Sequence, residues 1–582
     1  MMQQENRKYS RKGWKQQVRG AASLLGVLLF AHTAAAQDVE AVMKAPLLIS
    51  NGGLSLNQIA TLAPGDITAK NPYAMYLAGN LNLNFLGVVN IPLSFAYTNR
   101  QLSKEVSLPF NRFSIAPSYK WVKAYAGYAS MQFSPYSLAG HEIYGGGVEL
   151  TPDNGFKVSA IFGRLKKAVS GEEGLDPSYQ RMGGGFKVEY AGKQYSLGVN
   201  IFKAQDIAAS LPDSMAIAPQ DNLTGSVNAT VDFIKNIRFG AEYGFSALNR
   251  NTGKGAHRFR LFETQGDPAV YHAIKTNLTY TSPAGAVGTT YERVAPNYAT
   301  LGAYYMTNDY ENITANFSTA IKKVNIAIDG GYQRDNLSRQ KTNTTSRMIF
   351  SGNVSANVNE KLSLSANLSN IQSYLYINDE YDRVTQTNEF QNLDTLNVTQ
   401  LNISTSLNAA YLLQSDKERR QGLNAGFMYQ KAAERQEFTS YSGNDIYNGS
   451  LSYQYAIIPA RFNASAAVNC NYNRMPGDMY IQAMTYNLSL QKAFFDVLRT
   501  GFTGTYSNMT NQSGNLSNVF NIRLTGGYLF LRRHNLSLNL AMIHTAGQAK
   551  TQVQYSANLA YSYVFNAVVT RKDKKIRMDA DF

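Results

Sequence analysis

The residues of this chain that could carry out chemistry are few, and the most suggestive pair is His141-Glu142. The pair follows a short stretch that contains Ser134 and Ser137, so a hydroxyl, a base and an acid lie close together in the sequence. Hydrolysis needs a nucleophile, a base and an orienting group within hydrogen-bonding reach. A histidine that caps nearby turn backbone is far more common than a catalytic one, and we therefore expect no catalytic residue here.

The other candidate groups are weaker still. The remaining histidines after residue 36 are His257, His272, His534 and His544. His544 falls on the apolar face of its predicted strand and His534 in a predicted turn. Glu149 and Asp329 are candidate charges of a water-filled interior, but solvated carboxylates need no special role. The sequence has no Walker-A loop, no His-x-x-x-His pair and no dinucleotide fingerprint. We expect no enzyme activity, no cofactor and no metal site.

The single cysteine, Cys470, excludes a disulfide framework and a multi-cysteine metal site. It shares the parity of Ala466, Val468 and Tyr472, so we interpret it as a small hydrophobic residue on an apolar face.

The elements that must position these groups are strands with one apolar and one polar face. In Leu401–Tyr411 the residues Leu401, Ile403 and Leu407 alternate with Asn402, Ser404 and Asn408. Successive side chains of a strand point to opposite faces, so this period of two predicts a half-buried ribbon. The pattern recurs in Leu223–Phe233, Ile237–Ala247, Met348–Val358, Leu362–Leu368, Tyr447–Tyr455, Phe462–Tyr472 and Val553–Phe565. Each ribbon is about ten residues long, the length of a tilted transmembrane strand. The pattern predicts an all-β fold, a single large antiparallel transmembrane β-barrel.

The first residues resemble a secretion signal. A basic region that ends at Arg19 precedes the short apolar segment Ala21–Ala31, and Ala34-Ala35-Ala36 supplies a cleavage site. We expect residues 1–36 to be a cleaved signal peptide and Gln37 to start the mature chain. A membrane-anchoring helix would need about 20 apolar residues.

Composition agrees with a barrel. The mean hydropathy of −0.29 is too low for a helical membrane protein, whereas half of each barrel strand faces water. The net charge is +15, of which the signal contributes five, and the remaining basic residues gather in turns such as Lys417–Arg420. Basic turns indicate contact with anionic lipid headgroups and lipopolysaccharide rather than with nucleic acid. Tyr97, Tyr119, Tyr280, Tyr472 and Tyr563 stand at predicted strand ends, as in an interfacial aromatic girdle.

Connection lengths predict the topology. Short turns such as Asn359–Lys361 alternate with long connections such as Ala204–Asn222 and Asp379–Asp394, which we expect outside the cell. Keeping this alternation in phase needs weak strands near Pro46–Ala60 and Ala256–Glu263. The count is then about 28 strands, or about 26 without one weak hairpin, with both termini in the periplasm.

These boundaries predict three segments. They are the signal peptide 1–36, an outer-membrane barrel over 37–565 without a plug domain, and a basic periplasmic tail over 566–582. The barrel assembly machinery is expected to bind the ribbon that ends at Phe565.

Two stretches carry a family resemblance. Phe113–Trp121 and Phe133–His141, continued by Gly145–Leu150 and Ser159–Arg164, resemble large outer-membrane barrels of the Bacteroidota. The resemblance covers about the first third of the chain. It implies an outer-membrane location and a barrel fold, and no established activity. Gly145-Gly146-Gly147 and Gly183-Gly184-Gly185 open two hairpins here. We interpret these glycines as a kink or a site of close strand approach rather than as a ligand site.

The lumen of such a barrel is too wide for its own side chains to fill. Water, infolded loops or a second protein must occupy it. Two functions therefore remain open. The first is a channel or transport pore for solutes or polymers. The second is a non-enzymatic scaffold, a subunit of a secretion or assembly complex, whose lumen or rim binds a plug or periplasmic partner protein.

Overall fold

The structure, a computed structural model, describes most of the chain. The described residues are 45–64, 72–99, 112–171, 177–212, 217–253, 259–339, 346–369, 403–434, 442–548, 551–570 and 577–578. The expected signal peptide, His257, Leu401, Asn402 and the Asp379–Asp394 loop lie outside these residues. No helix in the described part of the chain is long and apolar enough to cross a membrane.

All described residues of regular structure, apart from the one-turn helix η2 (Ala208–Ser210), belong to a single antiparallel sheet. Its first strands are β1 (Leu48–Leu62), β2 (Tyr73–Phe85), β3 (Val89–Thr98), β4 (Arg112–Ile115), β5 (Ser118–Tyr119), β6 (Val122–Gln132), β7 (Ala139–Leu150), β8 (Phe156–Lys166), β9 (Gln180–Ala191), β10 (Tyr195–Ile207), β11 (Asp221–Ile234), β12 (Ile237–Asn249), β13 (Ala269–Ser282) and β14 (Gly285–Val294). Each strand pairs with its sequence neighbours, so the sheet grows as a meander.

The meander continues to the end of the chain. Its later strands are β15 (Tyr310–Ile321), β16 (Val324–Asp335), β17 (Ser346–Asn357), β18 (Leu362–Ser369), β19 (Ile403–Ser415), β20 (Arg419–Glu434), β21 (Ser442–Ile457), β22 (Phe462–Arg474), β23 (Tyr480–Phe494), β24 (Leu498–Asn511), β25 (Gly514–Phe530), β26 (His534–Gly547), β27 (Thr551–Val569) and β28 (Arg577–Met578). The short β28 pairs with Ala567 and Val568 of β27. The last long strand thus runs past Phe565 to Val569.

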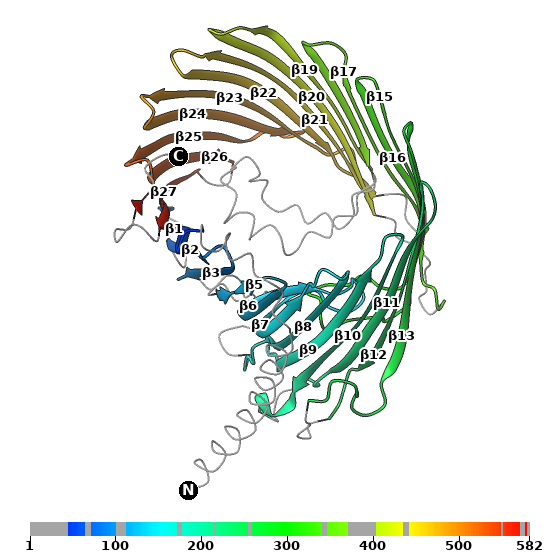
Figure 1. The fold of residues 1–582 in the computed structure, drawn as a ribbon. Helices are drawn as coiled ribbons and strands as arrows, with labels where there is room; N and C mark the ends of the chain where they lie inside the picture. The colour runs from blue at the N-terminus through cyan, green and yellow to red at the C-terminus, as the bar shows by residue number, and fades with distance from the viewer. Residues whose placement is uncertain are drawn as a thin grey trace.

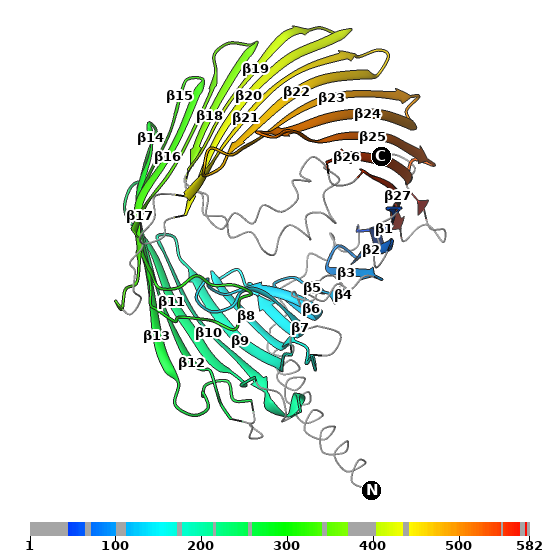
Figure 2. The same ribbon diagram turned by 180° about the vertical axis from the view of Figure 1, so that it is seen from behind.

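The sheet closes on itself between β1 and β27. Their register runs without a break from Leu48↔Val569 to Leu62↔Tyr555. Figure 1 shows the blue first strand beside the red last strand, and Figure 2 shows the same closed ring from behind. With β4 and β5 as two pieces of one strand, the barrel has 26 strands. Closure leaves no sheet edge to a lipid environment, which cannot satisfy unpaired backbone groups.

Two of the expected weak strands have different outcomes. The strand expected near Pro46–Ala60 is present as β1. The prediction of a strand near Ala256–Glu263 is wrong, because the described residues 259–263 form no strand. This segment belongs to the β12–β13 loop, and its Phe259 and Phe262 rings pack on strands β8 and β9 instead of entering the sheet.

The faces of the strands follow the period of two. Leu407 and Phe427, which are partners across β19 and β20, are both well exposed on the outer face. Ser406 accepts a hydrogen bond from Asn367 on the inner face. The predicted register of this ribbon is therefore confirmed at its described residues. A closed barrel with an apolar outer face is the form in which strands cross a bilayer, so the chain is an integral outer-membrane β-barrel.

Aromatic side chains mark both ends of the outer face. Tyr429, Tyr447, Tyr472 and Tyr480 form a ring-to-ring ladder at the long-loop end, with centroids 5.0, 6.2 and 5.5 Å apart. At the short-turn end His534 stacks on Phe530 and Tyr563. Tyrosine rings with polar tips suit the boundary between hydrocarbon and headgroups.

Candidate functional site

The candidate site is the inner wall of the barrel, and its two sides differ. We call β6–β14 the loop-lined half, because the loops 133–138 and 295–309 fold onto its inner face. We call β16–β27 the bare half. Every buried hydrophobic residue among the described residues, apart from Ala74, lies between Ala129 and Tyr298.

The 133–138 loop is held to the wall by its own side chains. The Ser134 hydroxyl donates to Glu242 on β12. The Tyr136 hydroxyl donates to Oε1 of Glu292 on β14 over 2.6 Å, and the Ser137 hydroxyl donates to Asn200 on β10 over 2.5 Å. Burial and the hydrogen bond to Glu292 raise the pKa of the Tyr136 phenol far above its usual range, so this donor stays protonated.

The 295–309 loop packs on the 133–138 loop. The Tyr298 hydroxyl donates to the backbone oxygen of Tyr136 over 2.7 Å, and the Thr300 hydroxyl donates to that of Ser137 over 2.6 Å. Oδ1 of Asn222 on β11 accepts from the backbone N–H of Leu301 over 3.0 Å. Each loop thus satisfies polar groups of the other, as backbone away from water requires.

Apolar side chains also pack the 133–138 loop against the wall. Phe133 and Leu138 pack with Ile143 of β7, Ile161 of β8 and Phe202 of β10 in one buried cluster. Gly147 of β7 makes room for this cluster, because a Cβ there would lie 2.9 Å from Cε of Met131. A Cβ on Gly145 would lie 2.1 Å from the backbone oxygen of Phe162. The interpretation as a site of close strand approach is confirmed.

The candidate catalytic constellation is not assembled. Ser134 and Ser137 donate to Glu242 and Asn200, as described above. The His141 ring stacks on Tyr304 of the 295–309 loop, with centroids 4.0 Å apart, and its Nδ1 lies 2.8 Å from the backbone oxygen of Glu142. His141 therefore helps to anchor a loop.

The other predicted residues are separate from one another. Glu149 binds Lys157 over 3.0 Å, and Asp329 accepts from Ser351 over 3.2 Å, both on the inner face. Cys470 lies on the outer face, 4.0 Å from Nε2 of Gln482. His272 contacts the Tyr243 hydroxyl over 2.7 Å, also on the outer face. No group of metal-ligating side chains occurs in the described residues.

Sequence reasoning missed a buried ion pair on the outer face of the loop-lined half. Lys203 of β10 and Asp221 of β11 are paired and inaccessible to solvent. The β12–β13 loop covers them. Nζ of Lys203 donates to the backbone oxygen of Glu263 over 2.5 Å, and the N–H of Gln265 donates to Asp221 over 3.1 Å. The two residues are 18 positions apart, and no short motif could have indicated their pairing.

The bare half presents ladders of short polar side chains. On the inner face of β23 and β24, Thr485 pairs with Ser507 over 3.0 Å and Asn487 with Thr505 over 2.9 Å. Thr503 of β24 also donates to Ser489 of β23 over 3.3 Å on this face. Neutral amides and hydroxyls offer water and solutes weak hydrogen bonds without a fixed charge.

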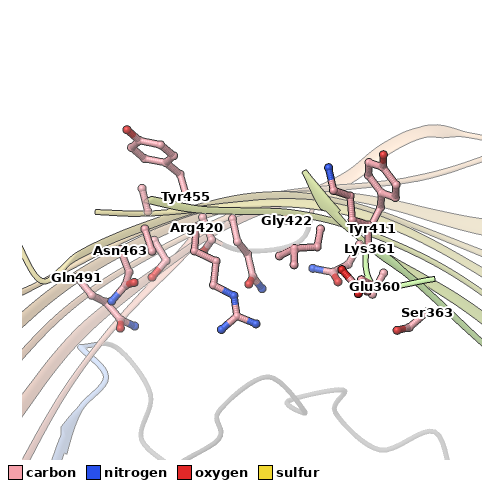
Figure 3. Close-up of a pocket in the computed structure, with 17 residues that line it drawn as sticks. Glu360, Lys361, Ser363, Tyr411, Arg420, Gly422, Tyr455, Asn463 and Gln491 are labelled. Carbon is pink, nitrogen blue, oxygen red and sulfur yellow. The ribbon is translucent and has the colours of Figure 1, made fainter. Parts of the chain in front are cut away.

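A hollow of about 610 Å³ lies against the bare half near the short turns. Figure 3 shows Arg420, Asn463 and Gln491 on one side of the wall, with Tyr411 and Tyr455 on the other. The first three residues share the inner parity of their strands. A guanidinium and two amides thus face the lumen, while the two phenols face the membrane.

Neither a protein-family model nor a curated protein matches this sequence. Solved structures resemble it weakly. The translocation pore of the P pilus usher has 11% identity and a TM-score of 0.38, over 89% of this chain and 99% of that chain. The siderophore receptor PirA from Acinetobacter baumannii has 10% identity and a TM-score of 0.36, over 88% and 80%. OccAB2 from the same organism has 10% identity and a TM-score of 0.30, over 88% and 98%. The fold given above rests on the strand pairing of the chain itself.

Proposed function

We propose that this protein is an outer-membrane channel that passes polar solutes or polymers through its lumen. The observation that carries the proposal is the bare half. Its described inner wall has polar ladders and a hollow, and no buried hydrophobic side chain. A barrel with more strands than a porin encloses more space than its own side chains fill.

The loop-lined half supports the same function. Among the described residues, infolded loops that are bonded to the wall narrow the lumen along β6–β14, and none lies on the inner face of β16–β27. The pore of this proposal is therefore eccentric, with its path along β16–β27. No catalytic step is assigned to it.

Several finer points belong to the proposal. They are a cleaved signal over residues 1–36, a barrel without a plug whose last long strand ends at Val569, four residues beyond the expected Phe565, and a periplasmic tail after it. Lipopolysaccharide, anionic lipids and the barrel assembly machinery are the proposed partners. The family resemblance of Phe113–Trp121 favours a Bacteroidota-type barrel.

Conductance of the purified barrel in a planar bilayer tests the channel. We expect stepwise openings that bilayers without protein do not show, together with permeation of uncharged sugars into liposomes. A barrel that is correctly folded but gives no conductance contradicts the proposal. Co-purification of a partner with such a silent barrel would favour the scaffold.

A further inference from the structure

One strand of the barrel is broken. β4 and β5 are separated by Ala116 and Pro117, yet they share one register with β6. Ile115 lies opposite Ala126, and Ser118 lies opposite Lys123. The two pieces are thus a single strand with an interruption near its middle. We call this strand the β4–β5 strand, and its boundary with β6 the β5–β6 seam.

Two prolines remove hydrogen bonds on both sides of this strand. The N–H of Ala116 donates to the backbone oxygen of Pro92 on β3 over 3.0 Å, and that of Ala124 on β6 donates to Pro117 over 2.8 Å. In an antiparallel ladder, a residue whose carbonyl accepts from a neighbour also donates its own N–H to that neighbour. Proline has no N–H, so each contact is half of the usual pair. Proline is normally confined to strands at the edge of a sheet.

The seam is also short. Among residues 112–132, β6 has two register partners in β4 and two in β5. By contrast, β1 and β27 are paired along all 15 residues of β1 where the barrel closes. Gly127 of β6 adds a distortion, because it has a φ of +92° and a Cβ there would lie 2.2 Å from the backbone oxygen of Phe113.

Apolar groups stand on both sides of the seam. On the inner side, Ala129 and Met131 of β6 belong to the buried cluster, and Tyr125 packs against it. On the outer side, Phe113 of β4 is 52% exposed toward the membrane. Arg112 of β4 forms an ion pair with Glu142 of β7 over 2.6 Å, which reaches across β6 and fastens the long-loop end of the seam.

We propose that the β5–β6 seam is a lateral gate for an amphiphile. The β4–β5 strand parts from β6, and a lipid-like molecule passes with its polar headgroup in the lumen and its apolar chains in the bilayer. The polar lumen is taken from the proposed function, whereas the opening in the wall is a separate property. Few hydrogen bonds have to break at this place, and on the membrane side the apolar chains meet the exposed Phe113 ring.

Lipid exchange between leaflets tests the gate. The barrel is reconstituted in liposomes that contain a phospholipid with a short fluorescent chain, and albumin extracts the label from the outer leaflet. The test protein carries Ser118→Cys and Lys123→Cys in a Cys470→Ser background. Ala124 and Pro117 share the hydrogen-bonded rung, so the neighbouring pair Ser118 and Lys123 has close side chains that suit a disulfide. The matched control is Ser489→Cys with Thr503→Cys, which are register partners across β23 and β24 with hydroxyl oxygens 3.3 Å apart.

When the seam disulfide is reduced, we expect albumin to extract more than the half of the label that lies in the outer leaflet. When the disulfide is oxidised, extraction should stop at that half. The control should extract equally in both states. Reduced and oxidised samples are the same folded protein, so a folding defect cannot imitate the result. Extraction that is unchanged by the seam disulfide overturns the proposal.

A second variant acts in the opposite sense, without cysteine. Pro117→Ala restores one N–H donor to the seam, and we expect exchange to slow by about fivefold, the equilibrium effect of one hydrogen bond of about 1 kcal/mol. Exchange as fast as in the wild type would count against the gate. Planar-bilayer conductance of both proteins should not change. A barrel that conducts but does not exchange lipid refutes the gate alone, and one that exchanges lipid but does not conduct refutes the channel alone.

Discussion

The two halves of the inner wall satisfy their polar side chains in different ways. In the loop-lined half, Tyr136 and Tyr298 are almost fully buried, and charged partners such as Glu292 face them. In the bare half, Asn487 and Thr505 bind each other across neighbouring strands and remain partly exposed. The first half is built like the core of a soluble protein, and the second like a wetted surface. The comparison predicts that substitutions in the first half cost stability, whereas those in the second change permeation.

The largest difference is expected at the buried ion pair. Lys203→Met leaves the Asp221 carboxylate buried without its cation, which costs about 3–5 kcal/mol. Asn487→Ala in the bare half removes one neutral hydrogen bond and should cost about 1 kcal/mol. Urea unfolding of both variants in detergent micelles measures the two effects. Equal losses would show that the ion pair, which lies on the outer face of the loop-lined half under the β12–β13 loop, is not shielded from water.

Tyr136→Phe should have the next largest effect. It removes a hydrogen bond to a carboxylate, a loss of about 1.5–3 kcal/mol. Because the pKa of Tyr136 is raised in the folded state, its contribution is complete below the ordinary value of 10.0 and falls as the pH rises above it. Limited proteolysis of the 133–138 loop across pH 8–12 tests this. The wild-type loop should become susceptible at alkaline pH, and the variant already at pH 8. A variant that resists cleavage like the wild type would show that the phenol does not hold the loop.

Gly302→Ala tests whether the loops are packed tightly. A Cβ there would lie 2.7 Å from both the Phe202 ring and the backbone oxygen of Ser137, and we expect a loss of about 1–3 kcal/mol. Gly526→Ala is the matched control, since its Cβ would meet nothing within 4 Å. The difference in urea midpoint between the two variants is the measurement. If Gly302→Ala is as stable as the control, the two loops are not packed against each other as described.

The smallest effect is expected in the bare half. Arg420→Gln removes one positive charge from the lumen, and the anion-to-cation permeability ratio should fall by up to about twofold, because salt screens a charge beyond about 8 Å. Arg419→Gln is the control, since the adjacent residue of a strand points to the opposite face. Reversal potentials in a salt gradient distinguish them. A larger shift for Arg419→Gln would invert the assignment of faces.

The sequence predicted the strands better than the loops. The ribbon Phe462–Tyr472 matches strand β22 to within two residues. Its period of two can be seen from neighbouring residues alone. The false strand near Ala256–Glu263 shows the limit. It was predicted only to keep short turns and long loops in alternation, and Phe259 packs on Phe162 of β8 instead of joining a ladder. Connection lengths alone do not say whether a segment pairs in the sheet or packs on it from a loop.

The contacts of the candidate site could not be predicted from local sequence patterns, because the partners are far apart in the chain. Ser134 was noted for its distance of seven residues from His141, yet its partner is Glu242, 108 positions away. Tyr136 binds Glu292 over a separation of 156 positions. Neither separation leaves a mark in the local sequence. The polar inner faces of the bare half were predicted, because they belong to the strands themselves.

The closure of the barrel has a consequence for the order of assembly. The second neighbour of β1 is β27, so Leu48 cannot pair on that side until Val569 has been synthesised and has reached it. Every other long strand finds both of its neighbours close to it in the chain, whereas β1 and β27 each find only one there. The contact that completes the wall thus has the highest sequence separation and is the slowest to search for. Until then β1 and β27 are two open edges, each able to pair with another chain. A chaperone or assembly factor that covers either edge would act for the whole time that the rest of the meander takes to form.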